Sequence, residues 1–143
     1  MTTQDKIKYA IKLNNLDENE EKSLALILHT RIQEMKKEKI DFNINKIEKP
    51  QQYLEILEKL YKKSPSFLEP KTPVKEALFR LFVFNGNKPL TIKQINKHLS
   101  ELWEMSQFPR DISIEKLTSL LTNTSDYYIY PYGRKFNKSS LLF

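Results

Sequence analysis

The first half of the chain contains three stretches in which apolar residues recur every three or four positions. This spacing places the apolar side chains on one side of a helix, so it predicts helices over residues 3–13, 17–39 and 50–61. The second helix begins with Asp17 and Glu20, which are spaced as in a capping box, where each side chain accepts a hydrogen bond from the backbone of the other. The first half is therefore predicted to be helical.

Three prolines between residues 64 and 73 interrupt this periodicity. We interpret the segment as a connecting loop and place a domain boundary in it. The predicted organisation is a helical N-terminal region over residues 1–63, a linker over 64–73 and a second domain over 74–143. The long helix of residues 17–39 needs a surface to cover its apolar side. That surface is either the second domain or the same helix of a second copy, in a homodimer.

Two further helices joined by a tight turn are predicted in the second half. An apolar segment runs from residue 74 to residue 84 and stops at Asn85-Gly86-Asn87, which tolerate left-handed backbone and so end a helix. Thr91 is a favourable N-cap for the next helix, which is predicted to continue past Trp103. The apolar positions of that helix follow at intervals of three and four and are Ile92, Ile95, Leu99 and Leu102.

A third helix and a β-hairpin are predicted to follow a break near Pro109. The helix begins at residue 111 or 113 and ends near residue 122, and the residues expected to face the core are Ile114, Leu117, Leu120 and Leu121. Residues 127–130 have the composition of a strand, and residues 134–136 can return antiparallel to them. Pro131 and Gly133 fit a type I turn between the two strands.

The segment from Asn87 to Ile95 resembles the entry to the second helix of winged helix-turn-helix domains, where a small polar residue, proline, leucine and threonine precede a helix with this apolar spacing. The resemblance covers residues 74–143. It implies a mainly α fold, with N-terminal helices followed by a winged helix-turn-helix domain that ends in a small C-terminal β-hairpin. The long second helix, with Trp103 near its end, is similar to that of HARE-type winged-helix domains and the RNA polymerase delta subunit.

The net charge of +6 is unevenly distributed along the chain. Residues 1–62 contain 12 Lys and Arg against 11 Asp and Glu, whereas residues 63–143 contain 12 against 7. A basic field in the half that resembles a winged helix suits a polyanionic partner. We therefore expect double-stranded DNA as the partner and transcriptional regulation as the role. Because several elongated winged helices bind proteins, the alternative is a protein-interaction module, such as an accessory factor of polymerase or of another assembly.

The resemblance implies three kinds of DNA contact. Lysines of the second helix touch phosphates, the outward side of the third helix lies towards the groove, and basic residues near the hairpin tip clamp the backbone. On the third helix, lysine can reach guanine acceptors and asparagine can pair with adenine, although one outward residue, Glu115, is acidic. The candidate DNA-binding residues are Lys93, Lys97, Arg110, Lys116, Thr118, Ser119, Thr122, Asn123, Arg134, Lys135 and Lys138.

Composition excludes several other classes of protein. The chain has no cysteine, which excludes disulfides and thiolate metal sites, and its two histidines, His29 and His98, lack metal-ligand spacing. With two glycines and no nucleophile motif, we expect no phosphate-binding loop, no enzymatic activity and no cofactor. The longest apolar run, residues 24–28, is far too short to span a bilayer, and no signal peptide is visible. We expect a cytoplasmic protein.

Overall fold

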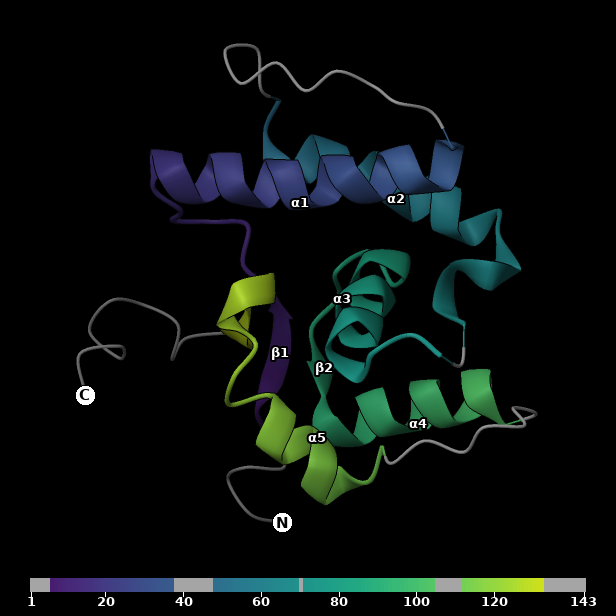
Figure 1. The fold of residues 1–143 in the computed structure, drawn as a ribbon. Helices are drawn as coiled ribbons and strands as arrows, with labels where there is room; N and C mark the ends of the chain where they lie inside the picture. Colours follow the sequence, from purple (N-terminus) through teal and green to yellow (C-terminus); the bar gives the residue numbers. More distant parts are fainter. Residues whose placement is uncertain (1–5, 38–47, 70, 105–111, 133–143) are drawn as a thin grey trace.

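A computed structural model of the chain describes residues 6–37, 48–69, 71–104 and 112–132 (Figure 1). The protein is mainly helical with a small three-stranded antiparallel sheet. In chain order the elements are β1 (Lys8–Ile11), α1 (Glu18–Lys36), α2 (Pro50–Lys62), the 3-10 turn η3 (Pro65–Leu68), α3 (Val74–Phe84), β2 (Leu90–Thr91), α4 (Ile92–Trp103), α5 (Ile114–Leu120), the 3-10 turn η4 (Ser125–Tyr127) and β3 (Ile129–Tyr132).

The elements form two helical pairs with α3 and the sheet between them. Figure 1 shows α1 and α2 side by side at one end of the molecule and α4 and α5 at the other. Helix α3 is buried along most of its length, because residues on nearly all its sides contact other elements. The core cluster takes side chains from α1 and α2, such as Leu28 and Leu57, and from α4 and α5, such as Leu99 and Leu117.

The segment predicted to be a linker lies against this core. Phe67 and Leu68 of η3 are buried in it, and the ring of Phe67 stacks on Phe84 at the end of α3, with the ring centres 4.7 Å apart. The predicted domain boundary at residues 64–73 stays a prediction. The apolar stripe of α1 is buried within its own chain, so the alternative in which this helix packs intramolecularly is the one observed.

The local predictions for the helices are confirmed at four starts and one turn. Asp17 and Glu20 form the capping box of α1, with backbone-to-carboxylate distances of 2.8 and 3.0 Å. Pro50 is the first residue of α2, and α3 covers the residues predicted for it. Thr91 caps α4. Gly86 and Asn87 have φ angles of 69° and 57°, the left-handed backbone predicted for that turn.

The helix predicted over residues 3–13 is wrong. Residues 8–11 form β1, the middle strand of the sheet, in the order β2-β1-β3. Tyr9, Ala10 and Ile11 are all buried, although their side chains alternate between two sides of the sheet. Tyr9, Ala10 and Ile11 follow one another directly, and over so short a run consecutive apolar residues match a helical stripe equally well.

The predicted turn at residues 130–133 is also wrong. Residues 125–127 form η4, Tyr128 adopts a left-handed backbone with a φ of 59°, and β3 runs from Ile129 through Pro131 to Tyr132. The described partner of β3 is β1, with Ile11 opposite Ile129 and Lys8 opposite Tyr132. Within the described residues β3 is an edge strand, where a proline is tolerated. The predicted return strand, residues 134–136, lies outside the described residues.

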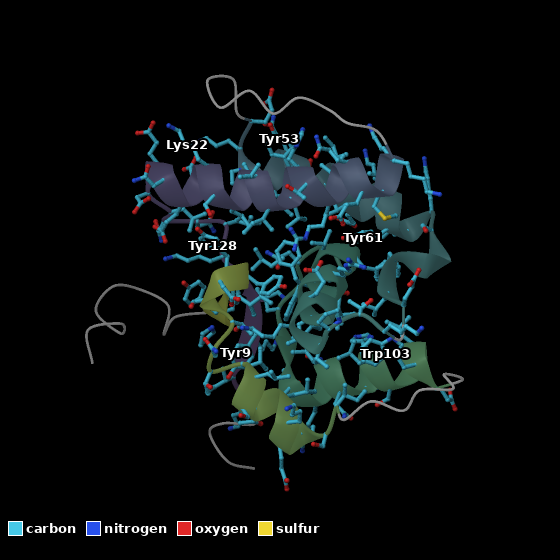
Figure 2. All side chains as sticks on the ribbon, in the orientation of Figure 1. Tyr9, Lys22, Tyr53, Tyr61, Trp103 and Tyr128 are labelled. Carbon is cyan, nitrogen blue, oxygen red and sulfur yellow. The ribbon has the colours of Figure 1, made fainter. Side chains whose placement is uncertain are left out.

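Two predicted core positions near the α4–α5 connection are exposed instead. The exposed fractions of Leu102 and Ile114 are 45% and 38%. Trp103 takes the buried position at the end of α4, and its indole N–H donates to the carbonyl of Leu68 at 3.3 Å (Figure 2). Ile114 is the first residue of the short helix α5, where a side chain has no preceding turn to pack on.

An ion network joins α1, α3 and η3. The carboxylate of Glu76 in α3 accepts hydrogen bonds from Nε and Nη2 of Arg31 in α1, at 3.2 and 2.6 Å, and from Arg80 at 2.9 Å. Arg80 also donates to the carbonyl of Phe67 at 2.9 Å. Burial opposes the charged form of Glu76, but the two guanidinium groups outweigh it and lower the pKa of this carboxyl.

Within the described ranges, none of the helices combines the length and the apolar character needed to cross a bilayer.

Candidate nucleic-acid interface

Helices α4 and α5 lie next to each other and form one end of the molecule (Figure 1). The inward sides of both helices are buried in the core, through Ile95 of α4 and Leu117 of α5, for example. The side-chain amide of Asn96 donates to the carbonyl of Ile112 at 2.7 Å, which ties α4 to the residues that lead into α5. Lys93, on the outward side of α4, is exposed.

The N-terminus of α4 is held by a second capping box. The hydroxyl of Thr91 accepts from the backbone N–H of Gln94 at 3.2 Å, and the Gln94 side chain accepts from the Thr91 backbone at 2.9 Å. Lys93 and Lys97 lie one turn apart in the first half of this helix, and both side chains are exposed. The capping box therefore stabilises the end of α4 that carries Lys93 and Lys97, the two residues predicted to contact phosphates.

Helix α5 presents its predicted polar residues outward. Its N-cap is Ser113, whose hydroxyl accepts from the backbone N–H of Lys116 at 3.2 Å. The exposure of these side chains confirms that they face outward. Thr118 is half-buried, and the exposed candidates are Lys116, Ser119, Thr122 and Asn123.

Two hydroxyl groups on this surface are already engaged with their own helix. Thr118 donates to the carbonyl of Ile114 at 2.6 Å, and Thr122 donates to the carbonyl of Ser119 at 2.7 Å. Because each hydroxyl already donates its single proton to a backbone carbonyl, it can only accept further hydrogen bonds. The two hydroxyls can therefore accept hydrogen bonds from the amino groups of bases, but they have no proton to donate to phosphate oxygens.

Among the described residues, the charges on this surface are balanced rather than basic. Lys93, Lys97 and Glu101 share one side of α4, with the lysines towards its start, and the exposed Glu104 is its C-cap. On α5, Glu115 precedes Lys116 and both are exposed. The remaining predicted cations, Arg110, Arg134, Lys135 and Lys138, lie outside the described residues.

Other candidate chemistry is scarce in the described part of the chain. No three or more His, Cys, Asp or Glu side chains gather there in a way that could hold a metal ion. His29 is buried in α1, with its ring edge-on to that of Tyr53 at 5.9 Å between centres. The ion network of the buried Glu76 was not predicted, because Arg31 lies 45 residues away from Glu76 in the sequence.

Comparisons of the chain with models of protein families, with curated proteins and with solved structures found no match.

Proposed function

We propose that this chain is a DNA-binding protein of the winged helix-turn-helix type, with a role in transcriptional regulation. The observation that supports the proposal is the packing of α4 against α5, with Lys93 and Lys97 exposed on one helix and a polar outward surface on the other. The elements from α3 to β3 follow in the order helix, strand, helix, helix, strand.

Helix α5 has dimensions suited to a DNA groove. A helix with its side chains is about 10–12 Å across, which fits the major groove, about 12 Å wide, and the 7 residues of α5 extend over about 10 Å along the helix axis. Lys116 can donate to guanine acceptors, and Asn123, just after the helix, can pair with adenine. The acceptor lone pairs of Thr118 and Thr122 add contacts to base amino groups.

Phosphate contacts come from α4 and from basic residues elsewhere in the second half. Lys93 and Lys97 approach one strand of the duplex, in line with the positive end of the α4 dipole. Arg110, Arg134, Lys135 and Lys138 supply the further cations that the balanced charge of the described surface requires.

The proposal is tested by fluorescence anisotropy with a labelled random duplex at a series of salt concentrations. Replacing Lys93 and Lys97 together by alanine is expected to weaken binding and to reduce the slope of log K against log salt by about two, one for each lost phosphate contact. The matched control replaces Lys36 and Lys59, exposed lysines of α1 and α2, and leaves the slope unchanged. An unaltered slope in the first variant contradicts the assignment of α4.

A protein-interaction module is the second candidate, and two observations favour it. The described charges of the α4–α5 surface cancel, and Leu102 and Ile114 are exposed there. If the chain fails to bind duplex DNA even at low salt, this candidate replaces the first, and the same helices become the surface for a protein partner. We also propose a homodimer through the N-terminal helices. Because the apolar stripe of α1 is buried within its own chain, the contact would use the outward sides of α1 and α2, where Leu26 and Ile56 are exposed. Analytical ultracentrifugation of the full chain tests it.

A further inference from the structure

A hollow of about 430 Å³ lies against the sheet. Ala10 in the middle of β1 forms part of its lining, and Tyr130 and Tyr132 of β3 line it as well. The turn of residues 86–89 and the segment of residues 13–15 complete most of the boundary. None of the candidate DNA-binding residues of α4 and α5 lines this hollow.

The strand register places lysines beside tyrosines on this side of the sheet. Tyr9 and Ile11 belong to the core cluster, so the alternate residues of β1 point away from the core. In the antiparallel pairing Lys8 lies opposite Tyr132, so their β-carbons are about 5 Å apart. Both side chains are exposed, and the exposed fraction of Tyr132 is 59%.

A second lysine and tyrosine continue the same surface. Ala10 lies opposite Tyr130, and the small side chain leaves room above the sheet. The ammonium of Lys12 lies 5.8 Å from the centre of the Tyr130 ring. Lys12 and Tyr130 both line the hollow, so a cation and an aromatic ring meet at its surface.

Among the described residues, the other polar groups around the hollow are carboxamides, and none of the lining side chains is a carboxylate. Asn14, Asn15 and Gln51 supply amide groups at this boundary. Asn87 has a structural role, because its amide bonds both the N–H and the carbonyl of Ile11 at 2.8 Å. Aromatic rings suit the faces of bases, ammonium groups suit phosphates, and amides suit base edges.

Two carboxylates lie near this surface without being among the described lining residues: that of Glu58, beside Gly86, and that of Glu20. Burial raises the pKa of the Tyr130 phenol, and the negative charge of Glu20 raises it further. Glu20 serves the capping box of α1, where it accepts from the backbone N–H of Asp17. The negative charge of Glu20 opposes the binding of an anion, so a variant without this charge, Glu20→Gln, should bind an anionic ligand more tightly.

We propose that this side of the sheet binds single-stranded nucleic acid, with bases stacked on Tyr130 and Tyr132 and phosphates held by Lys8 and Lys12. The occupant is single-stranded because the bases of a duplex are stacked on one another and cannot lie against the tyrosines. The 4 residues of β3 extend over about 13 Å, which accommodates a few unstacked nucleotides. The hollow has no lining residue among those described in α4 and α5, although Lys8 lies opposite Thr91 at the start of α4.

The test measures the binding of a labelled oligothymidylate of about ten nucleotides to the full chain by fluorescence anisotropy. Tyr132→Ala is expected to weaken binding about tenfold, because it removes a stacking surface, whereas Tyr132→Phe retains the ring and the affinity. Tyr132 is exposed, so circular dichroism should confirm that the alanine variant folds.

Two charge variants sharpen the test. Lys8→Ala should reduce the salt slope for the single strand by about 0.7. Glu20→Gln should tighten binding a few-fold, because glutamine keeps the capping-box acceptor and removes the negative charge. The double alanine variant of Lys93 and Lys97 should leave single-strand binding unchanged, which separates this site from the duplex surface.

Three outcomes would overturn the proposal. The first is no binding of the oligothymidylate at low salt. The second is full affinity in Tyr132→Ala together with a loss in the Lys93 and Lys97 variant, which would assign all nucleic-acid binding to α4. The third is Tyr132-dependent binding of a proline-rich peptide in place of the oligothymidylate, which would assign the hollow to a protein partner.

Discussion

Glu76 receives hydrogen bonds from two guanidinium groups, one on α1 and one on its own helix. Its side chain is 10% exposed, so the two arginines keep an otherwise unfavourable buried charge ionised. Arg31 also lies over the ring of Phe79, with its guanidinium carbon 5.5 Å from the ring centre. The network therefore joins the N-terminal helices to α3 through both charge and packing.

Because the pKa of Glu76 is lowered in the folded protein, its contribution to stability depends on pH. The contribution is complete above the unfolded pKa, about 4.3, and is lost as the pH falls through the lower, folded pKa. We expect Glu76→Gln to reduce the free energy of unfolding by about 3 kcal/mol at neutral pH and to remove part of the loss seen on acidification.

Urea unfolding at several pH values between about 3 and 7 measures both effects. The control is Glu101→Gln, which changes an exposed carboxylate of α4 and is expected to alter stability by less than about 0.5 kcal/mol. If Glu76→Gln has the same stability as the unaltered chain at neutral pH, the ion network does not hold α1 on α3.

At the scale of elements, helix starts and the turn after α3 follow from neighbouring residues. Thr91 belongs both to the short strand β2 and to the N-cap of α4, so one residue joins a sheet edge to a helix start. Its backbone pairs with Lys8 of β1, and its hydroxyl accepts from the N–H of Gln94. The orientation of α4, and with it the placement of Lys93 and Lys97, depends on this junction.

Thr91→Ala is expected to lower the free energy of unfolding by about 1 kcal/mol, because an N–H of the first turn of α4 loses its acceptor. Thr91→Ser retains the hydroxyl and should stay within a few tenths of a kcal/mol of the unaltered chain. Urea denaturation of the three proteins measures the difference. Equal losses in both variants would assign the effect to the threonine methyl group rather than to the cap.

At the scale of the whole molecule, the middle strand of the sheet comes from the start of the chain. β2 and β3 belong to the second half, and each pairs with β1 rather than with the other. The core cluster likewise includes residues from α1 to β3. The sheet and the core both need residues from the two sides of the predicted boundary.

This arrangement makes the predicted domain boundary testable. A fragment of residues 64–143 lacks β1, which leaves the paired edges of β2 and β3 without partners and uncovers α3. We expect the fragment to lose the cooperative urea transition of the full chain, as followed by circular dichroism. A fragment that unfolds cooperatively, with the same midpoint as the full chain, would support two independent domains.

Much of the helical part of this fold could be predicted from sequence, whereas the sheet and part of the candidate site could not. The outward residues of α5 were predicted because Leu117 and Leu121 repeat at helical spacing. The surface of lysines and tyrosines around Tyr132 was not predicted, because it forms only when residues 8–12 lie beside residues 130–132. Leu102 and Ile114 fit the apolar spacing of their helices and are nevertheless exposed. Apolar spacing does not show how far along a helix the neighbouring elements cover it.

Caps, turns and apolar periodicity act over a few residues, so neighbouring residues were enough to determine the capping boxes, the left-handed turn at Gly86 and the extent of α3. Tertiary contacts decided what the local pattern left open. Residues 8–11 satisfy a helical stripe, yet two strands from the other half offer backbone partners on both sides, and residues 8–11 form a strand there. In the same way Glu76 lies on a helix beside Arg80, and the second guanidinium that stabilises its buried charge, that of Arg31, comes from 45 residues away.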